Sequence, residues 1–418
     1  MHLLIQKFGG TSVQTKENRD HVIRQIKGAL DKQYKLVVVV SAIGRSPDPY
    51  ATDSLLKMVD YEVTTDSTKR ELDMLMSCGE TIASVVLSNE LQQNDINATA
   101  LSGAQAGLIT NDEYNEAKIK HVKPERIKHE LKTHDVVVVA GFQGRTKSGD
   151  ITTIGRGGSD TTAAAFGAAL QAEAIEIFTD VDGMMTADPR VVDSASSIDV
   201  VTYAETSNLA HHGAKVIHPR AVEIAMQAEI PIRIRSTYLE EEGGTLITSS
   251  WGQEKGIDIP DRLVTGIAHI EDIAQILIKI DEDDLESQAR IFTMMENAGI
   301  SVDFINISST YVVFTLPMEV SDEAVKMLLD EGFNVEVTKN CAKVSAVGAE
   351  MTGIPGVLAT LTSVLIENDV QILQAADSHT TIWVLIHDKH IKQAVNALHE
   401  AFELDSLNKQ TNMNQLPS

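Results

Sequence analysis

The sequence predicts an α/β protein in which a three-layer αβα domain with a mostly parallel sheet precedes two ferredoxin-like modules. Over the first 250 residues apolar strands alternate with amphipathic helices, which is the pattern of a parallel sheet covered on both faces. Residues 36–40 and 135–140 are continuous valine-rich runs, typical of strands buried on both sides. Further on, the chain repeats itself at an offset of about 70 residues, which indicates an internal duplication.

In the first region we expect helices near residues 17–32, 54–61, 69–94 and 160–171, and a further strand at 175–179. Ligands of such a domain bind at the carboxyl ends of the strands. We also expect Cys78-Gly79-Glu80 to open an apolar helical stretch, and Ser159 or Asp160 to cap the helix that follows a glycine-rich loop. Residues 240–244 and 249–256 are interpreted as a turn and an exposed connector.

The second region contains two copies of the order strand, helix, strand, strand, helix, which is the ferredoxin-like pattern. The second copy has no closing strand, because only a polar tail follows its last helix. A surplus strand at 263–268 precedes the first copy, and we expect it to complete the sheet of the second, so that the first module is inserted in the second. The expected divisions are a first domain at 1–250, the completing strand at 263–270, the two modules at 271–340 and 341–405, and the tail at 406–418.

The composition narrows the classes of function. Among 418 residues there are 60 acidic and 35 basic side chains, giving a formal net charge of −25, which argues against binding of nucleic acid. Two distant cysteines exclude a disulfide framework, and no secretory signal or membrane span is recognised, so a cytoplasmic protein is expected. An acidic protein that handles an anionic substrate has to concentrate its cations locally.

Two glycine-rich segments contain such cations. Lys7-Phe8-Gly9-Gly10-Thr11-Ser12 follows the first strand, where glycine N–H groups, hydroxyls and a lysine can hold an anion. Gly155-Arg156-Gly157-Gly158-Ser159-Asp160 precedes a helix start, which can hold phosphate or carboxylate. The simpler alternative is a capped helix after a flexible loop, but an arginine without a function there would cost desolvation. The spacing fits neither the dinucleotide fingerprint nor the Walker P-loop.

Further polar groups leave alternatives open. Thr179 and Asp180 end a strand, where they either contact a nucleotide or cation or form an Asx turn. Glu80 either favours the positive start of a helix or holds an ammonium group. Residues 211–219 add Lys215 and three histidines, for which solvent-facing or capping roles are favoured over zinc, and no metal site of protein ligands is expected.

Taken in order, these segments resemble the four signatures of the aspartokinase family: residues 7–12, 155–160, 178–183 and 213–219. The duplicated half resembles the tandem ACT regulatory domains of that family, so the likeness spans nearly the whole chain except the tail. It is strongest to the single-function class of bacilli. The resemblance implies the amino-acid-kinase (carbamate-kinase-like) fold. It also implies transfer of the γ-phosphate of ATP to the β-carboxylate of L-aspartate, the first step of the pathway to diaminopimelate, lysine, threonine and methionine.

The resemblance also implies roles for single residues. Lys7 would stabilise the transferring phosphoryl group and Asp160 would orient Lys7. The aspartate substrate would be bound by polar groups of four segments: Ser41, Thr52, Glu80, Arg156, Gly157, Gly158 and Ser159. ATP, with Mg²⁺, would be bound by strand-end and loop residues: Lys7, Phe8, Gly9, Gly10, Thr179, Asp180, Met185, Arg190 and Lys215. Met185 stands where the family often has tyrosine.

Regulation by a pathway end product would act through the ACT domains, which are also expected to join the chain into a homodimer. Among effectors, meso-diaminopimelate is favoured over lysine or threonine. The expected effector residues lie in both modules: Asp303, Asn306, Gly353, Pro355, Gly356, Val357, Gln374 and Asp377. The corresponding loop of the first module, residues 281–285, lacks the Pro-Gly pair.

Two other functions compete. One is an enzyme of the same fold that acts on glutamate, acetylglutamate or a nucleoside monophosphate. Glu80, as a partner for an ammonium group, argues against acylated or amine-free substrates, and the ACT pair argues against UMP. The other is a non-catalytic amino-acid sensor, against which the presence of Lys7, Arg156 and Asp160 argues.

Overall fold

The computed structural model describes residues 2–59, 65–214, 216–239, 243–249, 263–282, 284–349, 351 and 356–405. The chain forms two compact units. The first consists of residues 1–184, 197–210 and 215–260, and the second of residues 185–196, 211–214 and 261–418. Two short segments from the first 250 residues, 185–196 and 211–214, therefore belong to the second unit. The domain boundary expected at residue 250 does not include this assignment.

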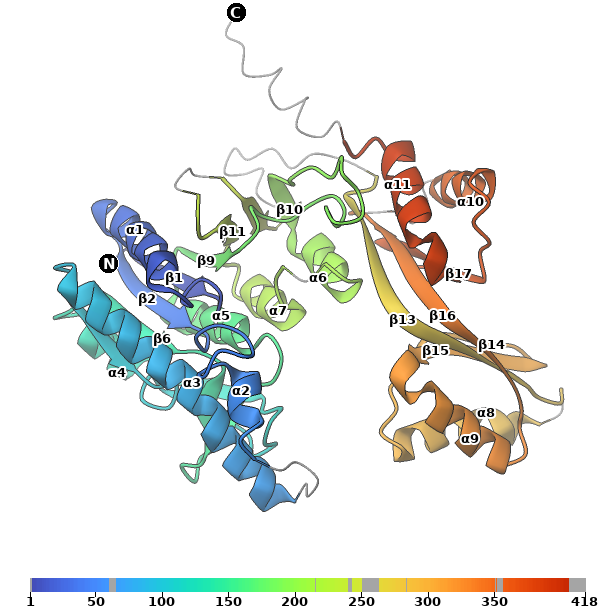
Figure 1. Cartoon of the computed structure of the whole chain (residues 1–418), viewed down its shortest axis with the longest axis horizontal. Helices are drawn as coiled ribbons and strands as arrows, with labels where there is room; N and C mark the ends of the chain where they lie inside the picture. Colours follow the sequence, from blue (N-terminus) through green and yellow to red (C-terminus); the bar gives the residue numbers. More distant parts are fainter. Residues whose placement is uncertain are drawn as a thin grey trace, which may run out of the picture. The chain divides into compact units, whose positions relative to one another are not determined.

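An eight-stranded sheet forms the centre of the first unit (Figure 1), in the order β10-β12-β11-β9-β1-β2-β6-β3. All neighbours are parallel except β11 and β12, so the predicted mostly parallel sheet is confirmed. The valine-rich runs of β2 and β6 are completely buried, as their composition predicts. The strands are β1 (Leu3–Phe8), β2 (Lys35–Val40), β3 (Ala98–Leu101), β6 (Val136–Ala140), β9 (Ala174–Thr179), β10 (Val200–Thr202), β11 (Ile232–Ser236) and β12 (Thr245–Thr248).

Helices cover both faces of this sheet and complete the three layers. On one face α1 (Lys16–Asp31) and α3 (Asp66–Gln93) share an apolar core with β1, β2 and β6. On the other, α5 (Gly158–Leu170) packs on β1, β2 and β9, and α7 (Pro219–Gln227) packs on α5. The shorter helices are α2 (Thr52–Leu56), α4 (Glu125–Glu130) and α6 (Tyr203–His211).

Helix α3 corrects one expectation. It runs without interruption for 28 residues, so Cys78, Gly79 and Glu80 lie in its interior and do not open a helix. Gly79 does not break the helix; it permits close packing instead. A Cβ at this position would lie 2.8 Å from the Cβ of Ala42 and from the carbonyl oxygen of Tyr50. The helix-dipole explanation for Glu80 is therefore wrong, because the charge sits far from the helix start.

A small second sheet, which the sequence did not predict, contacts α3 through β8. Its order is β5-β4-β7-β8, with β4 (Leu108–Thr110), β5 (Ile119–Val122), β7 (Gln143–Arg145) and β8 (Ile151–Thr153). Its strands are three or four residues long, too short to give a clear alternation of apolar and polar side chains. It brings residues 111–117 and 153–157 to the same part of the unit.

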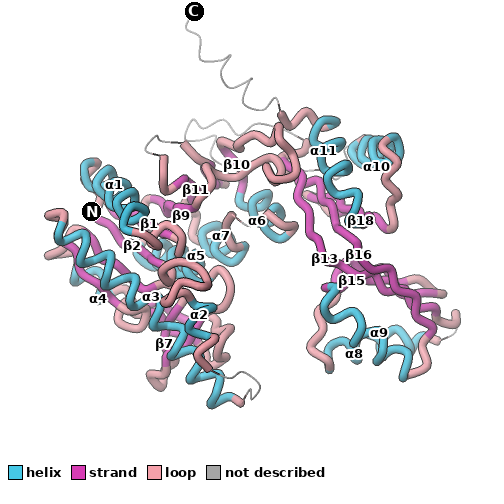
Figure 2. The backbone as a smooth tube through the Cα atoms, viewed as in Figure 1, coloured by secondary structure: helices cyan, strands magenta, loops and turns pink. Residues whose placement is uncertain are grey.

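The second unit is built on two long strands, visible as extended magenta stretches of the tube in Figure 2. They are β13 (Gly266–Lys279) and β16 (Asn334–Val347), at the centre of a sheet ordered β14-β15-β13-β16-β18-β17. The duplication appears in the element bounds, because β15 (Tyr311–Pro317) and β18 (Thr381–His387) differ by 70 positions at both ends. The other pairs are α8 (Leu285–Asn297) with α10 (Val357–Glu367), β14 (Asp303–Ile307) with β17 (Gln374–Asp377), and α9 (Ser321–Asp330) with α11 (Ile391–Ala401).

The two halves of β13 pair differently. Residues 266–270 lie beside residues 343–347 of β16, whose other neighbour is β18. Residues 273–279 lie between β15 and the first half of β16, and register shifts separate the two halves. The first half of β13 thus adds a strand to the module that contains β17 and β18, which is the pairing that insertion of the first module in the second would produce. The strand begins at Gly266, three residues after the expected start.

No helix in the described parts of the chain is both long and apolar enough to cross a membrane.

Candidate active site

A cavity of about 850 Å³ opens at the carboxyl ends of β1, β2 and β9 in the first unit. It gathers residues from segments that are more than a hundred positions apart in the sequence. All of the predicted catalytic and substrate-binding residues line it, together with part of the predicted nucleotide set: Lys7, Gly9, Gly10, Ser41, Thr52, Glu80, Arg156, Gly157, Gly158, Ser159, Asp160, Thr179 and Asp180. Both glycine-rich segments thus face one space, at the sheet edge where the fold class places ligands.

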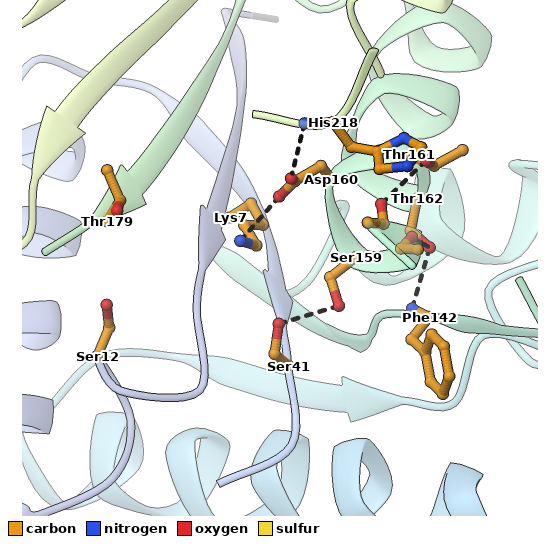
Figure 3. Close-up of polar contacts among 12 residues, drawn as sticks. Lys7, Ser12, Ser41, Phe142, Ser159, Asp160, Thr161, Thr162, Thr179 and His218 are labelled. Atoms are coloured by element: carbon orange, nitrogen blue, oxygen red, sulfur yellow. Dashed lines mark hydrogen bonds and ion pairs between the residues drawn. The ribbon is translucent and has the colours of Figure 1, made fainter. Parts of the chain in front are cut away.

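An ion pair lies within this cavity. Lys7 at the end of β1 places its Nζ 2.7 Å from Oδ1 of Asp160 in the first turn of α5 (Figure 3). Both side chains are almost buried, with 13% and 11% exposed. The backbone N–H of His218 donates to Oδ2 of Asp160 at 3.3 Å. Asp160 therefore holds Lys7 in a fixed position and partly neutralises it.

The start of α5 differs from the expectation in its cap. The N-cap is Gly157, in a left-handed conformation with φ of 67°, and no side chain caps the helix. Ser159 and Asp160 lie in the first helical turn, and so the prediction that one of them caps α5 is wrong. Glycine is required at 157, because a Cβ there would lie 2.1 Å from the ring of His218. An uncapped helix start that lines a cavity is suited to an anion.

Arg156 is an exposed residue at the edge of the cavity. The argument that an idle arginine would cost desolvation therefore does not hold, because the loop keeps the guanidinium in solvent. Nearby, the hydroxyl of Ser41 donates to that of Ser159 at 3.0 Å (Figure 3), which joins the end of β2 to the start of α5. The cavity thus has a cation at its edge and hydroxyl groups on its wall.

Among the acids that line the cavity, Glu80 has the most strongly shifted pKa. Only 3% of the residue is exposed, and burial raises the pKa of its carboxyl to about 8. Oε1 accepts the backbone N–H of Ala42 at 3.1 Å, whereas Oε2 is buried without a hydrogen-bond partner among the described residues. A buried carboxyl with one unsatisfied oxygen on a cavity wall is suited to a cationic ligand, which would supply the missing partner.

Strand β9 brings two more polar groups. The hydroxyl of Thr179 donates to Oδ1 of Asp180 at 3.0 Å, and both residues line the cavity. Phe8 is not a lining residue, since its side chain is fully buried and stacks on Phe178 with 4.6 Å between the ring centroids. Any contact between Phe8 and a ligand would involve its backbone.

Besides Phe8, three further residues predicted to bind ATP are not among those lining the cavity. Met185 and Arg190 belong to the second unit, where Arg190 is exposed and forms a bidentate contact with Asp188. Lys215 lies outside the described residues. The cavity also includes residues that the sequence did not indicate: Arg45, Leu72, Met76, Asn115, Glu116 and Phe142. Of these, only Arg45 carried a usable signal, a cation next to a glycine shortly after β2.

The three histidines of residues 211–219 have different environments. The ring of His218 accepts the backbone N–H of Arg220 at 3.3 Å and caps α7, as a capping role predicts. His212 belongs to the second unit and packs on Trp383, with 5.6 Å between the ring centroids. Burial, with the nearby charge of Lys343, lowers the pKa of His212 to about 4. A solvent-facing role is therefore wrong for His212.

The described residues expected to bind an effector lie on β14, on β17 and at the start of α10 in the second unit. Asp303 pairs with Lys343, and Gln374 donates to the carbonyl oxygen of Phe304 at 2.7 Å. Asn306 and Asp377 are exposed, Gly356 precedes α10, and Val357 is buried in an apolar core. Gly353 and Pro355 lie outside the described residues.

Comparison with known proteins identifies the family. Residues 2–236 match the amino acid kinase family, and residues 336–400 match the ACT domain. Aspartokinase 1 of Bacillus subtilis (strain 168) is 55% identical over 404 residues, which is 97% of this chain and 100% of that protein. The chain belongs to the aspartokinase family. The predicted family, fold class and enzyme class, an ATP-dependent kinase, are thereby confirmed.

Solved structures show the same architecture. E. coli aspartokinase III in complex with aspartate and ADP (R-state) has a TM-score of 0.76 and 24% identity, covering 96% of this chain and 99% of that chain. The same protein with lysine and aspartate (T-state) has a TM-score of 0.75 and 25% identity, with the same coverage. Aspartokinases are therefore similar to this chain over almost its full length, catalytic and ACT regions included.

Proposed function

We propose that the cavity binds L-aspartate and ATP and that the enzyme transfers the γ-phosphate to the β-carboxylate of aspartate, forming 4-phospho-L-aspartate. The observation that carries the proposal is the meeting of Lys7, Asp160 and Arg156 with the unsatisfied carboxyl of Glu80 in one cavity. An amino acid has both an ammonium and a carboxylate, and this cavity offers a partner for each. Acetylglutamate and nucleoside monophosphates lack the ammonium group, so they would leave Glu80 unsatisfied.

On the amino-acid side, Arg156 and the helix start at residues 157–159 would hold the α-carboxylate, with Ser41 and Thr52 on the same wall. Glu80 would bind the ammonium group through Oε2. On the nucleotide side, the backbone N–H groups of Gly9 and Gly10 and the strand-end residues Thr179 and Asp180 would surround the phosphates. Met185, Arg190 and Lys215 stay proposals for this nucleotide side.

The reaction makes few covalent demands on the protein. The β-carboxylate oxygen attacks the γ-phosphorus while the bond to the β-phosphate oxygen breaks and ADP leaves, and negative charge spreads over the equatorial oxygens. Lys7, held by Asp160, supplies a preorganised positive charge where that charge develops. Because the pair is nearly buried, its field is screened less than that of a surface lysine.

Mg²⁺ would neutralise the phosphates further. The carboxylates of the cavity are dispersed, and the described residues contain no cluster of three or more acids, histidines or cysteines. This donor set suits an ion that is bound mainly by phosphate oxygens and water. When bound, Mg²⁺ supplies charge neutralisation between the nucleotide phosphates.

The test is a hydroxamate assay, in which hydroxylamine traps the acyl phosphate formed from aspartate and ATP. We expect hydroxamate formation with L-aspartate and none with N-acetylaspartate, which lacks the cationic ammonium that Glu80 would bind. Turnover of glutamate or a nucleoside monophosphate in preference to aspartate would overturn the proposal. No turnover of any acceptor would favour the amino-acid sensor.

We further propose that the chain is cytoplasmic and that, apart from residues 185–196 and 211–214, its domains are those expected from the sequence. It would form a homodimer through its ACT modules and respond to a pathway end product, with meso-diaminopimelate ahead of lysine and threonine. E. coli aspartokinase III, which binds lysine, supports the effector class but not the choice of effector. Titration of each compound against the initial rate tests this, and no inhibition by any of the three would contradict it. Sedimentation equilibrium tests the dimer.

A further inference from the structure

A second buried acid lies directly behind the cavity wall. Asp73 is on α3, two turns before Glu80, and none of the residue is exposed. Its neighbours Leu72 and Met76 line the cavity, whereas Asp73 itself does not. Within the described residues no lysine, arginine or histidine forms an ion pair with it. An uncompensated buried carboxylate is costly unless hydrogen bonds satisfy it.

Three donors from two other segments converge on this carboxylate. The backbone N–H of Asn115 lies 3.0 and 3.1 Å from the two carboxylate oxygens. The backbone N–H of Thr153 donates to Oδ2 at 2.9 Å, and the hydroxyl of Thr153 donates to Oδ1. Burial raises the pKa of Asp73, and these three hydrogen bonds oppose that rise by favouring the charged form. Asp73 thus joins α3 to the loop at 111–117 and to the end of β8.

Both attached segments form walls of the cavity. Thr153 is three residues before Arg156, and Asn115 and Glu116 line the cavity themselves. The backbone N–H of Ala117 donates to the carbonyl oxygen of Thr153 at 2.9 Å, which holds the two segments side by side. A Cβ at Gly155 would approach the carbonyl oxygen of Asn115 to 3.4 Å. The loop that carries Arg156 therefore packs against the segment at 111–117, which Asp73 holds in position.

Asn115 shows that this wall is constrained. Its φ is 71°, a left-handed conformation that asparagine tolerates but does not prefer. Its side-chain Oδ1 is buried without a hydrogen-bond partner among the described residues. The left-handed backbone of Asn115 and its two contacts with the carboxylate of Asp73 show that this part of the cavity wall has a defined conformation.

We propose that Asp73 is a positioning residue for the amino-acid half of the cavity, acting through Asn115 and Thr153 on the loop that carries Arg156. This inference rests on the proposed function. The hydrogen bonds of Asp73 to described residues go to Asn115 and Thr153 and not to the nucleotide side formed by residues 9–10 and 179–180. Its loss should therefore affect the two substrates unequally, which a general loss of stability would not do.

The test compares Michaelis constants in Asp73→Asn. Asparagine has the same shape as aspartate, but its amide NH2 group replaces one of the two acceptor oxygens. That donor would then face the backbone N–H groups of Asn115 and Thr153. We expect KM for aspartate to rise by at least about tenfold, because a small misplacement of binding groups is costly, while KM for ATP stays within about twofold. The matched control is Asp150→Asn on the β7–β8 hairpin, where the acid pairs with Arg70 and does not line the cavity, and both KM values should remain unchanged.

Thr153→Val serves if Asp73→Asn does not fold. It removes one hydroxyl donor and leaves the acid and the backbone in place, so we expect a rise of about threefold in KM for aspartate alone. Equal changes in both KM values, or an unchanged KM for aspartate in the folded variants, would overturn the inference. Failure of the proposed function would look different, since the wild-type protein would then show no aspartate-dependent release of ADP.

Discussion

Each unit of the molecule contains an ion pair between a lysine with a largely buried side chain and an aspartate, and the two pairs have similar lengths but different surroundings. In the first unit, Lys7 and Asp160 are 2.7 Å apart and both nearly buried. In the second unit, Lys343 and Asp303 are 2.6 Å apart, with 5% and 66% of their side chains exposed. Distance alone would assign both the same role.

The difference lies in what surrounds each ammonium group. Lys343 lies over the rings of Phe304 and Trp383, with its Nζ 5.8 and 5.4 Å from their centroids. Its ammonium group therefore forms cation–π interactions with both rings. Lys7 borders the cavity, beside the glycines of residues 9–10. An ammonium group that lies against aromatic rings contributes to the packing of its own unit. An ammonium group held in a fixed position beside a cavity can stabilise negative charge on a bound ligand. The comparison leads to four predictions, from the largest effect to the smallest.

Removal of either member of the first pair should have the largest effect. Lys7→Ala and Asp160→Ala should each lower kcat by about a hundredfold or more, equal to at least about 2.7 kcal/mol, because each removes a preorganised charge or its support. Initial rates at saturating aspartate and ATP measure this. The control is Lys35→Ala, which breaks a 2.7 Å surface pair with Asp135 and should leave kcat unchanged. Turnover close to wild type in either cavity variant would contradict the assigned roles.

Glu80→Gln should raise KM for aspartate by about tenfold to a hundredfold, the scale of a hydrogen bond to a charged group. With a pKa of about 8, the carboxyl is mostly neutral at pH 7 in the empty protein, and binding of an ammonium group requires its ionised form. In the wild type, KM for aspartate should therefore fall as pH rises from 6 to 8, and the Glu80 carboxyl should release a proton when aspartate binds. Calorimetry in buffers of different ionisation enthalpy detects that proton.

The matched control for this acid is Glu90→Gln, on the same helix, where the carboxylate pairs with Arg19 away from the cavity. Its KM for aspartate should keep the pH dependence of the wild type. The same pH dependence in Glu80→Gln would show that another group is responsible. In the empty protein the raised pKa of Glu80 also means that its contribution to stability is largest below pH 4.5 and is lost as pH rises toward 8.

His212 makes the second unit sensitive to acid. Its pKa is about 4 in the folded chain and 6.5 in the unfolded chain, so the unfolded state binds the extra proton between these values. The free energy of unfolding should fall by about 2 kcal/mol as pH drops from 6.5 to 4. Denaturant titrations at several pH values measure this. In His212→Gln the free energy of unfolding should no longer fall by this amount between pH 6.5 and 4. In the control His121→Gln, which changes an exposed histidine, the fall should be the same as in the wild type. An equal slope in all three proteins would contradict the prediction.

The smallest effect is expected for Lys343→Met. Methionine keeps the contacts with the two rings, and the exposed side of Asp303 can be hydrated, so no buried charge remains unpaired. Unfolding free energy should change by about 1 kcal/mol or less, and kcat without effector should stay within about twofold of wild type. Thermal melting and initial rates measure both. A loss of activity as large as that of Lys7→Ala would abolish the distinction between the two pairs.

The sequence predicted those features that arise from local pattern. The valine runs identified β2 and β6 because strands buried on both faces carry no polar residues, and the 70-residue offset identified the duplicated modules. Lys7, Arg156 and Asp160 were found because glycine, hydroxyl and charge stand together in short segments. Asp73, Asn115 and Phe142 were missed, since their positions depend on contacts between distant segments.

The sequence by itself thus determined the strands, the repeat and the two glycine-rich loops of this chain, because each depends on residues close together in the chain. Only the tertiary structure decided that Gly157 and not Ser159 ends the loop, that residues 185–196 and 211–214 join the second unit, and that Glu80 is buried with a raised pKa. These features depend on close approaches between segments, such as Gly79 against Ala42 and Asp73 against Thr153. Packing at such contacts sets the burial and the hydrogen bonds, and burial and hydrogen bonds set the chemistry of the side chains.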